Sequence, residues 1–420
     1  MSRPHIAILG AGPVGLEAAV AAVEEGLPFT VYESASEVAG NVRSWGHVRL
    51  FTPWSMNVSP RMRRILAGAD VEPPDDDSYC PTGRELTEQL YRRVGAVPEV
   101  EHRLRLATHV VEIGRDGLLK SDEIGTGQRA RKPFRLLVRG ADGSERLERA
   151  DVVLDCTGTY HNPNALGAGG IRAPGERLVE DRIIRRIPDF EVPSFEGDAP
   201  GWGGRRILLV GAGHSAQTAA RDLQGLLERV PETEVIWAVR SQQPTFGAVP
   251  DDPLPARDAL VRRAQELVSP DSPFDVRLGR SVERLEPSHG GIVVTLVTGD
   301  GSTETVTVDR IISLTGSVGD ARMYRQLQVH ECYATSGPMK LAAALLSSAG
   351  GDCLAQESQG VEALENPEPD FYILGSKSYG RNNTFLLRVG WEQVDEVFSR
   401  LAPAAAAEVR SASPISPETP

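Results

Sequence analysis

An apolar run of strand length opens the chain and leads directly into a glycine-rich turn. Residues 5–9 are followed by Gly10, Gly12 and Gly15, and an alanine-rich helical pattern begins at Leu16. In this spacing the first glycine permits a tight turn and the second lets the backbone approach a pyrophosphate, while the third lets the helix pack close to the strand. The helix N-terminus then offers unpaired N–H groups to the phosphates. The stretch therefore predicts a strand–turn–helix unit that binds a dinucleotide.

A second apolar run, residues 29–32, ends at the acidic residue Glu33, about 20 residues beyond the glycines. A carboxylate at the end of this strand can accept hydrogen bonds from ribose hydroxyls. It would also repel a 2′-phosphate, so the first site is expected to hold FAD or NAD rather than NADP. The alternative is a glycine-rich turn in another kind of α/β unit.

The same pattern returns in the second half of the chain. An apolar run at residues 206–210 leads into Gly211 and Gly213, and alanine, which the pattern allows, takes the third position at Ala216. The next apolar run ends in Arg240 instead of an acid. Because a guanidinium can hold a 2′-phosphate through two hydrogen bonds, we expect FAD in the first site and NADPH in the second. The alternative for Arg240 is a surface charge at a strand end.

Both turns lead to a β-meander and then to an apolar strand that ends in Thr-Gly. The predicted strands are 110–113, 134–138, 145–148 and 150–158 in the first half, and 274–278, 292–297, 304–308 and 309–316 in the second. This order predicts the α/β class, with two Rossmann-like three-layer domains, each a parallel sheet, helices and a meander, the second inserted in the first. The expected boundaries are 1–165 and 309–401 for the FAD-binding domain, 166–308 for the NADPH-binding domain with a Pro/Gly-rich linker, and 402–420 for a disordered tail.

Charge and composition limit the partners of the chain. A net charge of −13 argues against nucleic acid or an anionic membrane surface, and no apolar run approaches the length of about 18 residues that a membrane helix requires. Scattered cysteines without a Cys-x-x-Cys pair or a secretion signal indicate a cytoplasmic protein without disulfides. No spacing typical of a metal site is present, and we expect His102 and His109 to be solvated. The cysteines are Cys80, Cys156, Cys332 and Cys353.

The two glycine turns, Glu33, Arg240 and the two Thr-Gly strand ends together resemble the flavoproteins with two dinucleotide-binding domains. This group spans the thioredoxin reductase-like enzymes and the class B flavin monooxygenases. The resemblance covers about residues 5–400 and implies FAD in the first domain and NADPH in the second. It also implies that the strand ending at Gly375 and the helix after it lie against the flavin.

The chain departs from this family at four places. It has no pair of redox-active cysteines, and Ser376 stands where many members have an Asp that binds the ribityl chain. The segment 195–197 begins like a monooxygenase signature, but no His follows at the right distance. Gly40 and Asn41 replace the usual Gly-Gly after the acidic residue. The sequence is therefore similar to a divergent branch of the family.

We expect the cofactors to contact Gly10, Gly12, Pro13, Gly15, Glu33, Arg49, Gly158, Gly211, Gly213, His214, Ser215, Arg240, Gly316, Gly375 and Ser376. No catalytic side chain is identified. Further polar groups that could touch cofactor or substrate are Arg43, His47, Arg49, Asn162 to Asn164, Lys377, Tyr379, Arg381 and Asn382.

The function that the resemblance implies is an NADPH-using, FAD-dependent monooxygenase. It would oxygenate a small molecule through a flavin C4a-(hydro)peroxide. One alternative is an NADPH-dependent flavin reductase or dehydrogenase without its own cysteine pair, acting on a low-molecular-weight disulfide or a quinone. Another is a regulatory flavoprotein that binds nucleotides and turns nothing over. The sequence leaves the substrate and the oligomeric state open, a homodimer being one arrangement.

Overall fold

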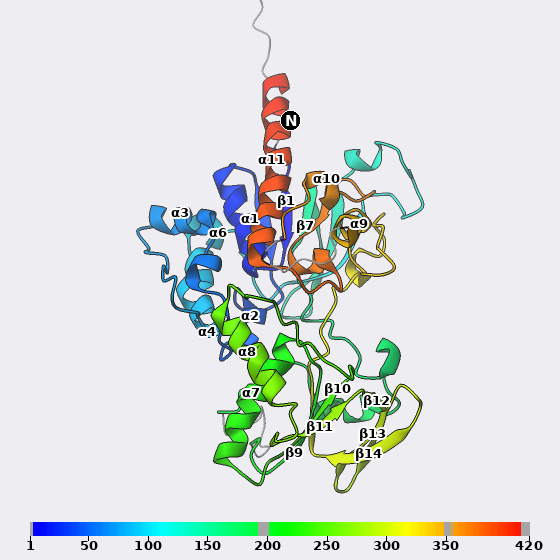
Figure 1. Ribbon diagram of the computed structural model, residues 1–420. Coiled ribbons are helices and arrows are strands. Elements are labelled where there is room, and N and C mark those ends of the chain that lie inside the picture. Colours follow the sequence, from blue (N-terminus) through cyan, green and yellow to red (C-terminus); the bar gives the residue numbers. More distant parts are fainter. Residues whose placement is uncertain (1–2, 192–200, 348–353, 355, 413–420) are drawn as a thin grey trace, which may run out of the picture. The chain divides into compact units, whose positions relative to one another are not determined.

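The computed structural model describes residues 3–191, 201–347, 354 and 356–412, the last ten of these by their backbone alone (Figure 1). The chain divides into two compact units. The first comprises Met1–Gly46, Pro53–Asn162 and Val318–Pro420, and the second comprises His47–Thr52 and Pro163–Ser317. The second unit is thus inserted in the first, as the order of the sequence patterns predicts.

A parallel five-stranded sheet forms the centre of the first unit, in the order β16-β7-β1-β2-β3. Its central strands are completely buried and strongly apolar, as strands covered on both faces must be. The strands are β1 (Ile6–Leu9), β2 (Phe29–Tyr32), β3 (Leu104–Arg105), β7 (Val152–Asp155) and β16 (Phe371–Ile373). The expected strand positions at β1, β2, β7 and β16 are confirmed.

Helices cover one face of this sheet and a meander covers the other. Helix α1 (Pro13–Glu24) packs against α11 (Leu387–Ala412) and α3 (Pro60–Gly68), and Figure 1 shows α1 in blue beside α11 in red. The antiparallel meander consists of β4 (His109–Arg115), β5 (Phe134–Arg139) and β6 (Glu145–Ala150). Its apolar face packs against the sheet through residues that include Leu136 and Leu9. These are the three layers predicted from the sequence.

Short helices fill the remaining connections of the first unit. A capping box begins the segment after residue 82, because Thr82 Oγ1 accepts the N–H of Glu85 and Glu85 accepts the N–H of Thr82. The helices are α2 (Gly40–Ser44), η1 (Trp54–Met56), α4 (Gly83–Leu86), the π-helix η2 (Thr87–Tyr91), α5 (Arg92–Gly95), α6 (Pro98–Glu101), η3 (Arg129–Arg131), η6 (Arg322–Tyr324), α9 (Met339–Ser347), α10 (Val361–Leu364) and η8 (Gly375–Tyr379).

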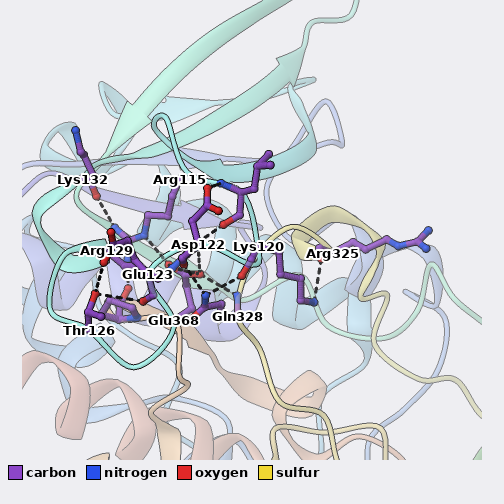
Figure 2. A network of polar contacts seen from close by, with 12 residues as sticks. Arg115, Lys120, Asp122, Glu123, Thr126, Arg129, Lys132, Arg325, Gln328 and Glu368 are labelled. Carbon is purple, nitrogen blue, oxygen red and sulfur yellow. Dashed lines mark hydrogen bonds and ion pairs between the residues drawn. The ribbon is translucent and has the colours of Figure 1, made fainter.

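A buried cluster of charges holds the long connection between β4 and β5 (Figure 2). Glu368 is fully buried and pairs with Arg115 at 2.7 Å and with Arg129 at 2.7 Å. Gln328 donates its backbone N–H to the same carboxylate, and the Arg129 guanidinium also donates to carbonyl oxygens of the connection. Every charge in the cluster has a partner, which offsets the free-energy cost of burying it. The role of the cluster is therefore structural.

The second unit repeats the plan of the first. Its parallel sheet has the order β11-β10-β9-β15-β8, and α7 packs against α8. The strands are β8 (Ile183–Ile184), β9 (Arg206–Val210), β10 (Glu234–Val239), β11 (Asp275–Leu278) and β15 (Arg310–Ser313). The other elements are η4 (Ala168–Gly170), η5 (Glu176–Arg182), α7 (His214–Arg229), α8 (Pro255–Glu266) and the meander β12 (Ser281–Ser288), β13 (Gly291–Val297) and β14 (Thr303–Val308).

Two sequence expectations are wrong. Residues 274–278 do not belong to the second meander, because β11 pairs in parallel with β10 and β12 is the first meander strand. A short alternating run does not reveal whether its partner is parallel or antiparallel. Residues 402–412 are not a disordered tail, because the alanine-rich sequence after residue 401 favours helix and α11 continues to Ala412.

Three sequence expectations fall outside the described residues. They concern residues 413–420 of the tail, the segment 195–197 and Cys353. Among the helices that the structure describes, none is long and apolar enough to cross a membrane.

Candidate functional site

The glycine turn of the first unit has the geometry that its sequence predicts. Gly10 has φ +93°, and a Cβ atom there would lie 2.9 Å from the carbonyl oxygen of Cys156. A Cβ at Gly15 would lie 1.9 Å from the Gly10 carbonyl oxygen, so only glycine lets α1 start so close to β1. At Gly12 no described atom lies within 4 Å of the Cβ position. Gly10 and Gly15 are thus required by close packing, whereas Gly12 borders open space.

The N-terminus of α1 borders the same open space. Gly12 is the N-cap, no side chain caps the helix, and Pro13 takes its first turn. The first N–H groups of a helix have no partner within the helix and carry its positive dipole end. An anionic group such as a pyrophosphate can therefore bind here through the backbone, which fits the expectation for Gly12 and Pro13.

Glu33 braces the turn, a role that was not predicted from its sequence position. Its Oε2 accepts the N–H of Ala11 at 2.7 Å, and its Oε1 accepts the N–H of Ala35 at 2.8 Å. The carbonyl of Ala11 in turn accepts the N–H of Ala39. Oε1 also accepts the Ser34 hydroxyl at 3.4 Å, whereas Oε2 has a second acceptor site, so the side chain can hold the turn and still accept a ribose hydroxyl.

Segments far apart in the sequence form the opposite side of this site. Gly158 has φ +69°, and apart from its chain neighbours the nearest described atom to its Cβ position is Ser376 Oγ at 3.8 Å. A Cβ at Gly375 would lie 3.1 Å from Val14 Cγ2, and one at Gly390 would lie 2.8 Å from the same atom. The carboxyl ends of β1, β7 and β16 thus meet the first turns of α1 and α11, the usual location of a ligand in a parallel α/β sheet.

The glycine turn of the second unit repeats this geometry. Gly211 has φ +131°, and a Cβ there would lie 2.3 Å from the carbonyl oxygen of Leu314, in the position that Cys156 holds in the first unit. Gly213 borders open space as Gly12 does, and Ala216 begins the close packing of α7. Gly316 has φ +85° and accepts the N–H of Asn164 at 3.0 Å.

His214 begins α7 and has an unsatisfied nitrogen. Its Nε2 is buried without a hydrogen-bond partner among the described residues, and its ring lies 5.2 Å from that of Phe51. Burial and then the positive charge of Arg257 lower the pKa of His214, so the ring is neutral at neutral pH. A buried nitrogen without a partner needs an explanation, and a bound ligand is one that the neighbouring glycine turn supports. The neighbouring Ser215 and the strand-end residue Arg240 are both exposed.

Several polar candidates have structural partners instead of facing open space. Lys377 is buried in an ion pair with Asp155, and the side chain of Asn382 accepts the N–H of Thr384. Tyr379 is an exception, because its buried hydroxyl has no partner among the described residues, and burial raises its pKa to about 12. Of the other candidates, Arg43 pairs with Glu37, Asn164 donates to Thr315, and Arg381 is exposed. The backbone carbonyl of Asn162 accepts the N–H of Val318. His47 and the exposed Arg49 lie in a segment of the second unit, and His47 Nε2 is buried without a hydrogen-bond partner among the described residues.

The described thiols do not form a redox pair. Cys156 is buried directly behind the first glycine turn, and burial raises the pKa of its thiol far above the ordinary value. No disulfide joins Cys156, Cys80 or Cys332 to another of the three. Among the described residues, no group of three or more His, Cys, Asp or Glu side chains could hold a metal ion.

Comparison with known proteins shows the same fold in solved flavoenzyme structures. No protein-family model matches the sequence, and no curated protein matches it. The bacillithiol disulfide reductase Bdr (YpdA) from Bacillus cereus aligns with a TM-score of 0.68 at 19% identity, over 96% of this chain and 100% of that chain. The ornithine hydroxylase PvdA from Pseudomonas aeruginosa aligns with a TM-score of 0.61 at 17% identity, over 95% and 99%.

A thioredoxin reductase from T. acidophilum also aligns, with a TM-score of 0.59 at 13% identity, over 97% of this chain and 100% of that chain. Reductases and monooxygenases are therefore both represented among the similar structures. At these identities the similarity establishes the two-domain fold and leaves the reaction to be argued from the sites themselves.

Proposed function

We propose that this protein is an FAD- and NADPH-dependent oxidoreductase that acts as a monooxygenase on a small molecule. The observation that supports this most is the duplicated glycine turn, with one copy ending its second strand in Glu33 and the other in Arg240. An acid at this position suits an unphosphorylated ribose and a guanidinium suits a 2′-phosphate. Two different dinucleotides in one chain are typical of a flavoenzyme reduced by NADPH.

The residues of the first unit fit FAD. In this proposal the N–H groups after Gly12 bind the pyrophosphate, and Glu33 accepts a hydrogen bond from the adenosine ribose. The Ser376 hydroxyl and the Gly158 backbone border the ribityl chain. Bound FAD supplies the redox chemistry, because it accepts a hydride from NADPH and its reduced form reacts with oxygen.

The residues of the second unit fit NADPH. The turn from Gly213 to Ser215 offers backbone N–H groups to the pyrophosphate, and Arg240 binds the 2′-phosphate. The neutral ring of His214 can donate or accept one hydrogen bond at Nε2, which satisfies this buried nitrogen when the nucleotide is present. The similar structures support this assignment, since one of them is titled as an ornithine N-hydroxylase with FADred and NADP+.

The arrangement of thiols favours the monooxygenase over a disulfide reductase with its own cysteines. Cys156 is the described thiol nearest to the first turn, and it is buried with a raised pKa, which opposes formation of the reactive thiolate. Oxygenation of a nucleophilic nitrogen or sulfur needs no protein thiol. Three of the similar structures are titled as hydroxylases of ornithine and one as a cadaverine monooxygenase, so primary amines are the first substrates to test.

A reductase without its own cysteine pair is the second candidate. The observation in its favour is the TM-score of 0.68 with a bacillithiol disulfide reductase. Such an enzyme would reduce a low-molecular-weight disulfide or a quinone directly from the flavin. It would consume NADPH without oxygen.

The two candidates predict different stoichiometry. Purified, FAD-loaded protein is mixed with NADPH and a panel of primary amines, sulfides, disulfides and quinones, first without oxygen and then with it. The monooxygenase consumes one oxygen per NADPH in the presence of its substrate and forms a hydroxylated product. Substrate-dependent oxidation of NADPH without oxygen supports the reductase instead. A flavin that NADPH cannot reduce would contradict both and indicate a regulatory nucleotide-binding protein.

A further inference from the structure

A buried ion pair lies directly behind the proposed flavin site. Lys377 Nζ lies 2.6 Å from Asp155 Oδ2, and the two side chains are 1% and 0% exposed. A second contact joins the ammonium to Thr157 Oγ1 at 3.1 Å, and its remaining side faces the Tyr324 ring at 5.0 Å. Lysine is rarely buried to this extent, and here the ammonium has two hydrogen-bond acceptors and an aromatic ring as partners.

Asp155 divides its two oxygens between this lysine and a turn. While Oδ2 binds the ammonium, Oδ1 accepts both the N–H of Thr157 at 3.1 Å and the Thr157 hydroxyl at 2.7 Å. These bonds close a turn over the end of β7, and the turn carries Gly158 into its positive φ. The position of Gly158 therefore depends on Asp155, and that of Asp155 on Lys377.

The same pair fixes the other side of the site. Ser376 directly precedes Lys377, and apart from the chain neighbours of Gly158 its Oγ is the described atom nearest to the Cβ position of that glycine. Residue 319 packs so closely over the Lys377 stem that a Cβ there would lie 2.4 Å from Cγ. Gly158 and Ser376 border the proposed ribityl path. Gly158 directly follows Thr157, and Ser376 directly precedes Lys377, so each is adjacent in sequence to a residue that the ion pair holds in place.

We propose that Lys377 and Asp155 are a positioning pair for the flavin, which holds Gly158 and Ser376 in place and keeps the charge behind the cofactor balanced. This inference rests on the proposed binding of FAD in the first unit. Lys377 acts through its neighbours and takes no part in the chemical step. The pair also has an electrostatic effect, because either charge without its counterion would be only weakly screened by water at this buried position.

Removing one charge or the other should shift the flavin midpoint potential in opposite directions. Removing the lysine in Lys377→Met leaves Asp155 without its counterion, and at a pH high enough to ionise it the carboxylate opposes the arrival of electrons and makes the midpoint potential more negative. Removing the acid in Asp155→Asn leaves a positive charge and makes it more positive. The double variant contains neither charge and returns the potential toward the wild-type value. A purely structural role would not produce shifts of opposite sign.

The experiment measures the flavin midpoint potential by spectroscopic reduction of the FAD-loaded protein across pH 6 to 9, because an unpaired carboxylate is ionised at the upper end of this range and an unpaired ammonium at the lower end. Lys340→Met is the matched control, because Lys340 is 53% exposed and its partner Glu365 is at the surface. Opposite shifts in the two single variants, restored in the double variant and absent in the control, are the expected result. Shifts of the same sign, or a variant that stays at the wild-type potential, overturn the proposal.

The test gives an answer even if Lys377→Met unfolds or the wild-type protein binds no FAD. Lys377→Met buries an unpaired carboxylate and can unfold the chain, in which case Asp155→Asn and the double variant carry the test alone. A positive shift in Asp155→Asn that the double variant cancels then supports the pair, and any other outcome overturns it. If the wild-type protein binds no FAD, the proposed function fails; if it binds FAD and the potentials do not move as stated, this inference alone fails.

Discussion

Glu33 accepts the backbone N–H of Ala11 at 2.7 Å, which ties the end of β2 to the middle of the first glycine turn. A residue expected to contact a ribose therefore also sets the shape of the turn that receives the pyrophosphate. In Glu33→Gln both backbone N–H groups lose a charged acceptor, and one of them loses its acceptor altogether because the amide has only one oxygen, which costs about 1.5–3 kcal/mol. We predict FAD binding weaker by roughly tenfold or more, measured by quenching of flavin fluorescence.

The control for this variant is Glu25→Gln, which changes the charge equally at an exposed position near the end of α1. It should bind FAD as the wild type does. Equal affinities for Glu33→Gln and Glu25→Gln would show that Glu33 has no part in the site.

The three glycines of the first turn should respond differently to the same added methyl group. In Gly15→Ala the methyl group meets the Gly10 carbonyl oxygen at 1.9 Å, so the helix must shift. We expect a loss of about 3 kcal/mol in the free energy of unfolding, measured without FAD by urea denaturation. In Gly12→Ala the methyl group enters open space, so stability should change by less than about 0.5 kcal/mol.

FAD binding separates the two variants a second time. The open space at Gly12 is where we place the pyrophosphate, so Gly12→Ala should fold normally and bind FAD poorly. A Gly12→Ala protein with wild-type affinity for FAD would move the nucleotide away from this turn.

Arg240 should determine the choice between NADPH and NADH. Arg240→Gln removes a charge-assisted contact to the 2′-phosphate, worth about 1.5–3 kcal/mol. We predict that the Kd for NADPH rises roughly 10- to 100-fold while that for NADH stays the same. Binding is measured by titration, and Arg262→Gln, an exposed charge on α8, is the matched control. A parallel loss for both nucleotides would contradict a specific role for Arg240.

The patterns that were read correctly from the sequence are local. The two glycine turns and their flanking strands each depend on residues within a short stretch, and all were predicted. The position of β11 in the parallel sheet depends on its pairing with β10, about 40 residues away in the chain, and periodicity carries no information about such a partner.

In the candidate site, too, the contacts between residues that are distant in sequence were not predicted. The bracing of the turn by Glu33 and the burial of Lys377 were not predicted from sequence. Lys377 meets Asp155 only because β7 and β16 are neighbours, although 222 residues separate them. A buried lysine has no sequence signature of its own, because what permits its burial is a partner supplied by the fold.

Glu17 should make the stability of the protein depend on pH. It lies buried on α1, faces Ser59 and Arg61 from α3 and Asp395 from α11, and burial raises its pKa to about 7 against an ordinary value of 4.5. The unfolded chain therefore releases this proton at lower pH than the folded chain. The contribution is fully present below about pH 4.5 and is lost as the pH rises toward 7, by about 3 kcal/mol in total.

Glu17→Gln keeps the hydrogen-bonding shape without the titration. Relative to the wild type, it should gain about 3 kcal/mol more in unfolding free energy at pH 8 than at pH 4.5, measured by urea denaturation. The exposed Glu25→Gln again serves as the control. A difference between Glu17→Gln and the wild type that is the same at both pH values would contradict a raised pKa at this position.

The central claim is that one chain binds FAD in its first unit and NADPH in its second. Anaerobic titration of the FAD-loaded protein tests it most directly, with the flavin absorbance followed as NADPH or NADH is added to the wild type, to Arg240→Gln and to Gly213→Ala. We predict that NADPH bleaches the flavin of the wild type at far lower concentration than NADH does. Arg240→Gln should lose this preference, and Gly213→Ala should keep its FAD but lose reduction by either nucleotide. Either of two results would contradict the account. One is a wild-type flavin that NADPH leaves oxidised, and the other is reduction of the flavin in both variants just as in the wild type.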